Sequence, residues 1–173
     1  MARYKKTDAY KESQHRHNTS DAGKKSNKKY RDSVKGKLNS IKGRARKGGI
    51  DFSLNLNDVE RIEKSSNVCA YCGTDISTIV SVIEFSHIYN GDNTVIIKIK
   101  KALKSGINRT KKLTFDRINS FEGYNSENVV LCCSLCNQAK GWIIPGDMYA
   151  EIAPAVIANI VNICKEAGLV LQE

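Results

Sequence analysis

The sequence predicts an α+β fold, in which a strand-loop-strand-helix unit is stapled by cysteines and flanked by a basic N-terminal helix and by C-terminal helices. Short apolar runs at 113–118 and 128–133 lie on either side of a loop that contains glycine, which is typical of two paired strands. The polar segment that follows, 137–140, tolerates a helix. Two Cys-x2-Cys pairs lie about 60 residues apart, which is the arrangement of a structural zinc site.

Six cysteines are present, and four of them are candidates for one tetrahedral zinc site. We assign the site to the two pairs: Cys69, Cys72, Cys133 and Cys136. Cys133 is preferred over Cys132 because a two-residue spacer precedes the last cysteine and Asn137 follows it at once. Cys132 and Cys164 are expected to be small buried hydrophobic residues. Taken alone, the two pairs would also suit a zinc ribbon without catalytic activity.

Positive charge is concentrated near the N-terminus. Residues 1–48 carry 16 Lys or Arg and 4 Asp or Glu, whereas residues 49–173 carry 12 and 14, so the net charges are +12 and −2. The length of 173 residues fits one compact domain with an extension. We therefore divide the chain into a basic arm at 1–48, suited to a polyphosphate partner, and a folded domain at 49–173. The alternative for the arm is a solvated tail.

Neither a membrane span nor a secretion signal is predicted. The sequence has no run of about 18 apolar residues, and its N-terminus lacks the apolar region of a signal peptide. We therefore expect a cytoplasmic protein, in which cysteines favour metal sites over disulfides.

The basic arm divides into two parts. Residues 1 to about 27 show little periodicity, so we expect them to be mobile without a partner. From Lys28 to Lys47 apolar residues recur at spacings of 4, 4 and 3, which predicts a helix that ends at Gly48-Gly49. The apolar residues form one narrow stripe: Tyr30, Val34, Leu38 and Ile41. The rest of this helix is basic and could contact phosphate groups.

Short elements are predicted between the arm and the second cysteine pair. Residues 50–54 alternate as a short strand, and Asn55 or Asn57 then caps a brief helix. The apolar, β-branched residues at 76–85 fit a strand or a buried connector. Alternation at 93–99 predicts a further strand.

Two segments flank the strand-loop-strand-helix unit. The run 98–112 carries seven Lys or Arg and no acid, which suits a basic hairpin or short helix, or a solvated loop. After the unit, Asp147 is a good N-cap, and Pro154 suits the first turn of a second helix that runs to Lys165 and stops at Gly168. The apolar face of this helix is broad, so it either enters the core or forms a dimer contact.

Two polar residues, Asp116 and Asn137, suggest a second metal site, and a third, Asn128, suggests a fixed loop beside it. Asp116 lies near the end of the first predicted strand and Asn137 at the start of the helix, so packing would bring a carboxylate and an amide oxygen together. Such oxygen ligands suit Mg²⁺, which can polarise a phosphate and stabilise the leaving oxygen. Asn128 lies where the loop rejoins the second strand, where its side chain could hold the loop closed.

The stretch DRINSFEGYNSENVVLCCSLCNQAK resembles the core of HNH, or ββα-metal, nucleases that carry a four-cysteine zinc site. It is especially similar to phage-type and PacI-like rare-cutting members, which have Asp-Arg where most of the family has Asp-His. With the upstream cysteine pair, the resemblance covers under half of the chain. It implies a metal-dependent DNA endonuclease of a bacterial or phage-infected cell, with structural Zn²⁺, catalytic Mg²⁺ or Mn²⁺, and double-stranded DNA as substrate. The implied product ends are 5′-phosphate and 3′-hydroxyl, and monomer or homodimer would decide whether one strand or both are cut.

The resemblance also implies roles for individual residues. Asp116 would be the first metal ligand, Asn128 the central asparagine of the family motif, and Asn137 the second metal ligand. Arg117 stands where the family usually has the histidine that acts as general base. A guanidinium cannot accept a proton from water, although it can bind the phosphate and stabilise its charge. Lys140 could contact the DNA backbone, or it could simply lie on the helix surface.

His87 is the candidate to replace the missing base. It is the only histidine outside the arm, and it lies between the first cysteine pair and the first strand of the motif. A proton-transfer role would contribute roughly 10²- to 10⁴-fold to the rate, whereas a lone histidine is usually structural. Tyr89 is a weaker substitute. Tyr71, inside the first cysteine pair, is expected to pack over the zinc site rather than to act in catalysis.

Two other functions are compatible with the sequence. The first is a zinc-stapled nucleic-acid-binding module that has lost catalysis, because the family's base is absent. The second is an enzyme that acts on RNA. A plasmid-cleavage assay separates the first from a nuclease, and structured RNA offered in the same assay separates the second.

Overall fold

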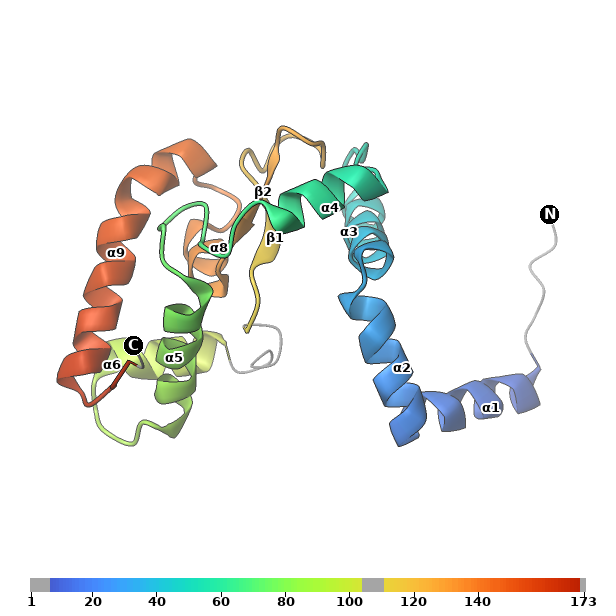
Figure 1. Cartoon of the computed structure of the whole chain (residues 1–173), viewed down its shortest axis with the longest axis horizontal. Helices are drawn as coiled ribbons and strands as arrows, with labels where there is room; N and C mark the ends of the chain where they lie inside the picture. The colour runs from blue at the N-terminus through green and yellow to red at the C-terminus, as the bar shows by residue number, and fades with distance from the viewer. Residues whose placement is uncertain (1–6, 104–110, 172–173) are drawn as a thin grey trace.

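The computed structural model describes residues 7–103 and 111–171. Figure 1 shows a strand pair in the middle of the fold, with α3 and α4 toward one side and α5, α6 and α9 toward the other. The elements follow in this order: α1 (Asp8–Thr19), α2 (Asp21–Asp32), α3 (Val34–Gly48), α4 (Leu56–Lys64), α5 (Ile76–Ile88), α6 (Thr94–Ala102), β1 (Thr114–Arg117), β2 (Val129–Cys132), α8 (Ser134–Lys140) and α9 (Gly146–Glu166).

The strand-loop-strand-helix unit is present as predicted, and it confirms the α+β class. β1 and β2 pair antiparallel, with Asp116 opposite Val130. α8 begins directly after β2, and its N-cap is Cys133, whose sulfur accepts a hydrogen bond from the backbone N–H of Cys136 at 3.4 Å. The short sheet therefore passes without a linker into the helix that packs against β1.

The sheet separates two apolar clusters, because successive residues of a strand point to opposite faces. Val129 and Leu131 of β2 face the cluster built with α3 and α4. Cys132 faces the larger cluster, which is built with α5, α6 and α9. The domain thus has three layers, with the thin sheet between two sets of helices.

The segment predicted as a strand or buried connector, 76–85, and the segment predicted as a strand from its alternation, 93–99, are helical. The segment 76–85 lies within α5 and the segment 93–99 lies largely within α6. Asp75 caps α5 by accepting from the N–H of Ser77 at 2.7 Å, and Asn93 caps α6 in the same way. Both helices bury isoleucine side chains in the larger cluster, and this tertiary burial outweighs the strand preference of β-branched residues.

The segment between the arm and the first cysteine pair contains less strand than predicted. Of residues 50–54, only Phe52 forms a bridge, which is parallel and pairs it with Tyr124 in the loop after β1. Asn55 is the N-cap of α4, and it forms a reciprocal capping box with Asp58. The alternative cap at Asn57 lies inside the helix.

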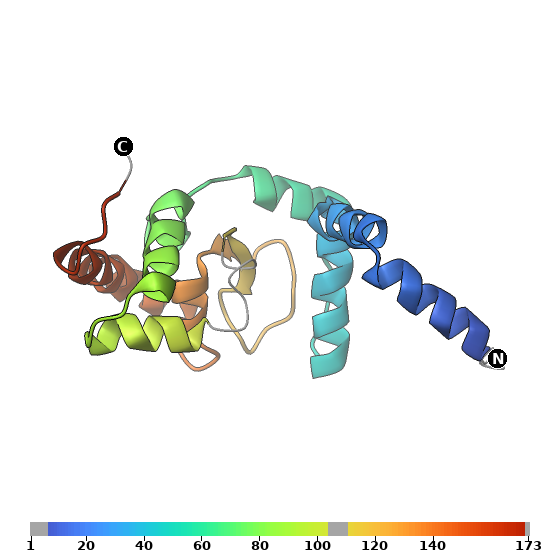
Figure 2. The same cartoon turned by 90° about the horizontal axis from the view of Figure 1, so that it is seen from below.

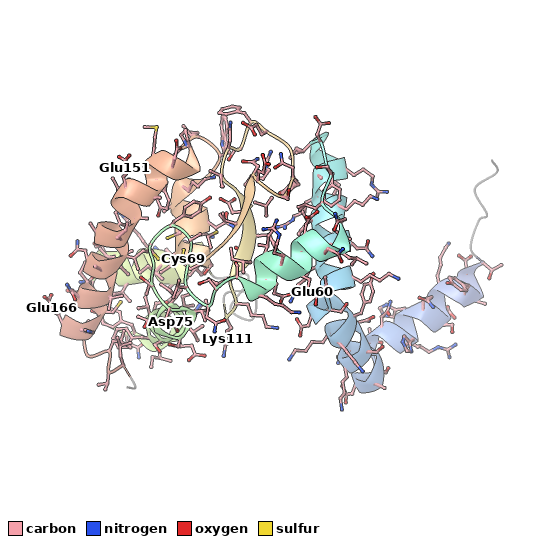
Figure 3. The ribbon with its side chains drawn as sticks, turned by 45° about the horizontal axis from the view of Figure 1, so that its top comes forward. Glu60, Cys69, Asp75, Lys111, Glu151 and Glu166 are labelled. Carbon is pink, nitrogen blue, oxygen red and sulfur yellow. The ribbon has the colours of Figure 1, made fainter. Side chains whose placement is uncertain are left out.

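The first part of the arm is helical, although its sequence lacks apolar periodicity. Thr7 and Ser20 cap α1 and α2, with hydroxyl oxygens that accept from backbone N–H groups three residues later. α1 buries no residue and α2 buries only Gly23. Figure 2 shows both helices leading away from the domain, and Figure 3 shows their side chains extending into solvent. Capping rather than packing accounts for these helices, and the expected mobility of the segment stays a prediction.

The single helix predicted from Lys28 to Lys47 is divided in two. Ser33 adopts an extended conformation (φ −73°, ψ 153°) between α2 and α3, and its hydroxyl caps α3. Only the part of the apolar stripe that lies in α3 packs on the core, with Ile41 1% exposed. Gly49, with φ +63°, ends α3 at the predicted place.

The chain after α8 forms one long helix rather than two. α9 begins after Pro145, contains Asp147 in its first turn, and includes Pro154 in its interior. Gly168 follows its end with φ +108°, as expected for a stop. One face of α9 enters the larger cluster, so the core position is confirmed. None of the described helices is both long enough and apolar enough to cross a membrane.

The basic run 98–112 is described only at its two ends. Residues 98–102 lie in α6, and residues 104–110 lie outside the described ranges, so the predicted hairpin or short helix is described only in part. Lys111 forms an ion pair with Glu84 at 2.5 Å, and Lys112 pairs with Asp32 at 3.2 Å.

Candidate active site

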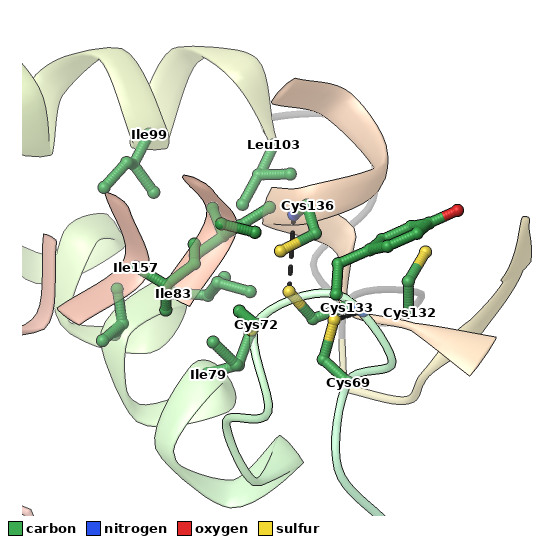
Figure 4. Packing of buried hydrophobic residues seen from close by; sticks show 14 of the residues in the cluster. Cys69, Cys72, Ile79, Ile83, Ile99, Leu103, Cys132, Cys133, Cys136 and Ile157 are labelled. Carbon is green, nitrogen blue, oxygen red and sulfur yellow. Dashed lines mark hydrogen bonds between the residues drawn. The ribbon is translucent and has the colours of Figure 1, made fainter. Parts of the chain in front are cut away.

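Four thiols converge between the strand pair and α5. Their sulfur atoms all lie within 4.8 Å of one another and all four residues are buried: Cys69, Cys72, Cys133 and Cys136. A tetrahedral zinc ion, with Zn–S bonds of about 2.3 Å, fits a cluster of this size. The N–H of Ala70 donates to the carbonyl of Leu131 at 2.9 Å and so joins the first pair to β2. Figure 4 shows that the sulfur of Cys132 lies apart from the other four, so the four cysteines that converge are the ones named from the sequence, and their binding of zinc stays a prediction.

Hydrogen bonds among the sulfur atoms divide the four thiols: they favour the thiolate form at Cys69 and Cys72, whereas the pKa values of Cys133 and Cys136 are raised. Donation from Cys133 lowers the pKa of Cys69 and lowers that of Cys72 to about 6, with a further contribution from Cys136. Burial raises the pKa of Cys132, which lies outside the cluster. Two of the four sulfur atoms are therefore predisposed to the thiolate form that zinc binds, and the other two would lose their protons when a metal binds.

Asp116 is the carboxylate around which the candidate site is built. Its side chain is 15% exposed. One of its oxygens, Oδ2, accepts a hydrogen bond from the hydroxyl of Tyr71 at 2.8 Å and lies 3.1 Å from the ammonium of Lys140. Tyr71 comes from the first cysteine pair and Lys140 from the end of α8. The zinc cluster and the carboxylate are therefore linked through the same two segments.

Lys140 is completely buried, with 0% of its side chain exposed. Besides its ion pair with Asp116, its Nζ donates to the hydroxyl of Ser120 at 3.2 Å and to the carbonyl of Gly141 at 3.5 Å. Burial of an ammonium requires an anionic partner and further acceptors, and this site supplies both. The surface position considered from the sequence was wrong, because a lysine at a helix end gives no sequence signal for burial.

Tyr71 takes part in the site more directly than expected. Its hydroxyl contacts Asp116, and the Lys140 ammonium lies 6.0 Å from the centre of its ring. Burial raises the pKa of Tyr71, and the charge of Asp116 raises it further. The phenol therefore stays protonated and acts as a donor to the carboxylate. The sequence did contain a signal for this role of Tyr71. The residue lies between Cys69 and Cys72, and a metal bound there would fix the backbone on both sides of it.

Asn137 contacts the face of β1 from which Asp116 also projects. Its Nδ2 donates to the hydroxyl of Thr114 at 3.0 Å. Thr114 and Asp116 are two positions apart on the strand, so their side chains project from the same face. The structure thus brings the predicted carboxylate and amide to one face, on adjacent elements. The role of both as ligands of a divalent ion stays a prediction.

Asn128 holds the loop between β1 and β2 closed, as its position suggested. Its Oδ1 accepts from the N–H of Asn119 at 2.8 Å, and its Nδ2 donates to the carbonyls of Asn119 and Gly123 at 3.0 and 2.9 Å. The side chain belongs to a residue that is 5% exposed. All three contacts are to backbone groups, so they fix the course of the loop whatever its other side chains are.

Arg117 does not join Asp116 in the site. Neighbouring residues of a strand face opposite sides, and the guanidinium of Arg117 lies over the ring of Tyr124, 5.1 Å from its centre. Its Nη1 also donates to the carbonyl of Glu122 at 2.6 Å. The structure therefore places this arginine against the loop, and its predicted contact with phosphate stays a prediction.

His87 is not brought into contact with Asp116 either. It lies in the last turn of α5, which packs mainly against α6 and α9. Its Nε2 is buried and has no hydrogen-bond partner among the described residues. Tyr89, the weaker substitute, caps the same helix end, where its hydroxyl accepts from the N–H of Asn93 at 3.3 Å.

The comparisons with known proteins bear on the fold. No protein-family model matches the sequence, and no curated protein matches it. A solved structure, that of the rare-cutting HNH restriction endonuclease PacI, is similar with a TM-score of 0.52 and 20% sequence identity, over 73% of this chain and 78% of that one. The match confirms the resemblance found in the sequence at the level of the fold, a ββα core with a four-cysteine cluster that can hold zinc.

Proposed function

We propose that this chain is a metal-dependent endonuclease of the HNH type, which hydrolyses phosphodiester bonds in double-stranded DNA. The observation that carries the proposal is the placement of Asp116, which β1 holds on the face where Asn137 of α8 also lies. The fold shared with an HNH restriction endonuclease supports the reaction class. The net charge of +12 on residues 1–48 supports a polyanionic substrate.

Asp116 and Asn137 would hold the catalytic Mg²⁺ or Mn²⁺. Both offer oxygen ligands, and two protein ligands leave room for water and a phosphate, as is usual for Mg²⁺. When bound, the ion supplies a Lewis acid that polarises the phosphate and stabilises the leaving oxygen. Among the described residues, the cysteine cluster is the other set suited to a metal, and its soft sulfur ligands select zinc.

The remaining residues would position these ligands. Tyr71 and Lys140 hold one oxygen of the Asp116 carboxylate and so orient the other. Asn128 fixes the loop that carries Ser120, the second partner of Lys140. Removal of any of these contacts should therefore lower activity through the placement of Asp116.

His87 is the candidate for proton transfer that the sequence suggested, whereas Tyr71, whose phenol stays protonated, would position the Asp116 carboxylate. Tyr71→Phe keeps the ring and removes the hydroxyl, whereas His87→Ala tests the prediction made from the sequence. A loss of at least roughly tenfold in His87→Ala would support proton transfer, whereas a loss in Tyr71→Phe would report the placement of Asp116. Full activity in either variant removes that residue from the reaction.

Cleavage of supercoiled plasmid tests the proposal directly. The wild-type protein should nick or linearise plasmid with Mg²⁺ or Mn²⁺, and Asp116→Asn should lose at least roughly a hundredfold in rate. Asparagine is preferred to alanine because it keeps an acceptor for the buried lysine. Glu151→Ala, on the exposed face of α9 (Figure 3), is the matched control and should retain full activity.

The rival function is a zinc-stapled nucleic-acid-binding module without catalysis. One observation favours it: Asp116 already has a cationic partner in Lys140, at 3.1 Å. Wild-type protein that binds DNA but leaves plasmid intact with every divalent metal would establish the rival. Cleavage of structured RNA in preference to plasmid would instead redirect the proposal to RNA.

The basic arm is the proposed DNA-binding extension. α3 carries exposed basic residues and packs its other side on the core, so it can contact DNA while fixed to the domain. Each lost phosphate contact lowers the slope of log affinity against log salt by about 1. Lys42→Ala and Arg46→Ala should each show this change, whereas Lys165→Ala on α9 should not.

A further inference from the structure

Tyr149 of α9 carries a hydroxyl group into the core, where it stays unpaired. The residue is 2% exposed, and its hydroxyl has no hydrogen-bond partner among the described residues. A buried polar group without a partner costs free energy, so such groups are rare and call for an explanation. Burial raises the pKa of Tyr149, and a thiolate at Cys136 raises it further, so the phenol stays protonated. The hydroxyl is therefore a donor that lacks an acceptor.

This hydroxyl belongs to a side chain that packs beside the cysteine cluster. Tyr149 and the four clustered cysteines are members of the same apolar cluster. The ring of Tyr149 meets that of Tyr71 edge to face, with 5.6 Å between the ring centres, and Tyr71 itself lies between Cys69 and Cys72. α9 also contacts α8, the helix that carries Cys136. Both the ring contact and the helix contact therefore place Tyr149 at the cluster.

Backbone donors reach only two of the four sulfur atoms. The sulfur of Cys69 accepts from the N–H of Cys133 at 3.2 Å, and the sulfur of Cys133 accepts from the N–H of Cys136 at 3.4 Å. In the part of the chain that the structure describes, no backbone N–H donates to the sulfur of Cys72 or Cys136. A zinc ion held by four thiolates leaves a surplus of two negative charges, and in a buried place this charge requires donors to the sulfur atoms.

We propose that, when zinc is bound, the hydroxyl of Tyr149 donates a hydrogen bond to the thiolate of Cys136 and so joins α9 to the metal site. The hydroxyl hydrogen turns freely about the C–O bond, so it can be directed at the sulfur while the ring keeps its contact with Tyr71. The bond gives the hydroxyl an acceptor and the sulfur a donor. Tyr149 is thus a positioning residue that acts through a ligand. The inference concerns the zinc site and does not depend on the nuclease proposal.

Zinc affinity provides the first test. Tyr149→Phe keeps the ring and removes only the hydroxyl. Competition with a chromogenic chelator measures the affinity of the full chain, and we expect Tyr149→Phe to bind zinc at least about tenfold more weakly than the wild type. Tyr124→Phe is the matched control and should bind zinc as the wild type does, since Tyr124 is a buried tyrosine of the smaller cluster, across the sheet. Wild-type affinity in Tyr149→Phe would overturn the inference.

Cobalt provides the second test, because its absorption reports on the sulfur ligands themselves. In the chain loaded with Co²⁺ in place of zinc, the sulfur-to-metal charge-transfer band should lie at longer wavelength in Tyr149→Phe than in the wild type. The reason is that a sulfur without a hydrogen bond holds its electrons less tightly. Tyr124→Phe should leave the band in place. Weaker binding with an unshifted band would mean that the hydroxyl affects only the packing of the core, and the inference would fail.

A measurement on the wild-type chain decides the matter even if Tyr149→Phe does not fold. With an NMR-active cadmium isotope bound in place of zinc, the hydroxyl proton of Tyr149 should exchange slowly with water and show a scalar coupling to the metal across the hydrogen bond. Absence of this coupling would refute the inference. A chain that binds neither zinc nor cobalt would refute it together with the zinc assignment. Tight zinc binding that depends on the hydroxyl, without plasmid cleavage, would support the inference and contradict the nuclease proposal alone.

Discussion

The arm helices and the strand-loop-strand-helix unit are stabilised in opposite ways. α1 and α2 have 12 residues each, bury only Gly23, and are held by hydroxyl caps a few residues away. β1 and β2 have four residues each and α8 has seven, yet this unit is bound by contacts between residues far apart in the chain. An example is the hydrogen bond of Tyr71 to Asp116, across 45 positions. Contacts between residues close in sequence stabilise α1 and α2, whereas contacts between residues far apart in sequence stabilise the candidate site.

This difference implies that a substitution in α1 or α2 should have only a local effect, whereas one in the strand-loop-strand-helix unit should disturb the whole unit. A lost cap removes one hydrogen bond from one helix end. A lost residue of the unit releases a metal ligand, an ion pair or a loop, each of which positions the others. Four substitutions examine this, in order of decreasing expected effect.

Loss of a zinc ligand should have the largest effect. Cys133→Ser removes a predicted ligand and alters the N-cap of α8. Structural zinc contributes on the order of 10 kcal/mol, comparable with the whole stability of a domain. We expect loss of bound zinc and of the cooperative melting transition. Cys164→Ala, buried outside the cluster, should keep one zinc per chain and serve as the control. Unchanged zinc content in Cys133→Ser would contradict the assignment.

Loss of the buried ammonium should be next. Lys140→Met leaves the carboxylate of Asp116 without its cation, which costs about 3–5 kcal/mol for a buried pair. Urea unfolding measures the change. The double variant Lys140→Met with Asp116→Asn should recover part of the loss, because no unpaired charge remains. If the double variant were as unstable as the sum of the two single changes, the pair would not be coupled.

Release of the loop should have a smaller effect. Asn128→Ala removes three hydrogen bonds to the backbone of Asn119 and Gly123, and we expect a loss of about 2–3 kcal/mol. Hydrogen exchange should rise in the loop that carries Phe121. Asn159→Ala, on the exposed side of α9, is the control. Faster exchange in both variants alike would argue against a specific role for Asn128.

Loss of an arm cap should have the smallest effect. Ser20→Ala removes the acceptor for the N–H of Gly23, at 3.1 Å, and should weaken α2 by about 1 kcal/mol. We expect faster hydrogen exchange at the start of α2 and an unchanged melting temperature of the domain. A clear shift in that temperature would show that the arm and the domain unfold together, contrary to the comparison above.

The same contrast explains which features could be predicted from the sequence. Residues 113–140 were predicted well, because the strand alternation, the closing asparagine and the Cys-x2-Cys spacing agree with one another. The strand suggested at 93–99 was wrong, since alternation of isoleucine and lysine also occurs in a helix with one buried face, as in α6. The helices at 8–32 were not predicted as such, because the prediction relied on the apolar pattern. Their sequence signal lies instead in the capping residues Thr7 and Ser20.

Within the site, the sequence predicted which residues take part better than it predicted the directions in which their side chains point. Asp116 and Asn128 were placed correctly relative to the strands, whereas Asn137, predicted at the start of the helix, lies in the middle of α8, which begins at Ser134. The burial of Lys140 and the turn of Arg117 toward Tyr124 depend on packing between elements that pattern alone does not orient. Such directions follow only once the sheet and α8 have been assembled.

The pairing of Lys140 with Asp116 affects how the candidate site would bind a divalent ion and a DNA phosphate. Together the two side chains carry no net charge, so a divalent ion entering beside them creates a surplus of two positive charges in a poorly hydrated place. A phosphate diester brings the opposite sign and relieves that surplus. Metal and nucleic acid would therefore raise each other's affinity by the same factor, as thermodynamic linkage requires. The metal ion and the nucleic acid should each bind weakly alone and more tightly when the other is already bound.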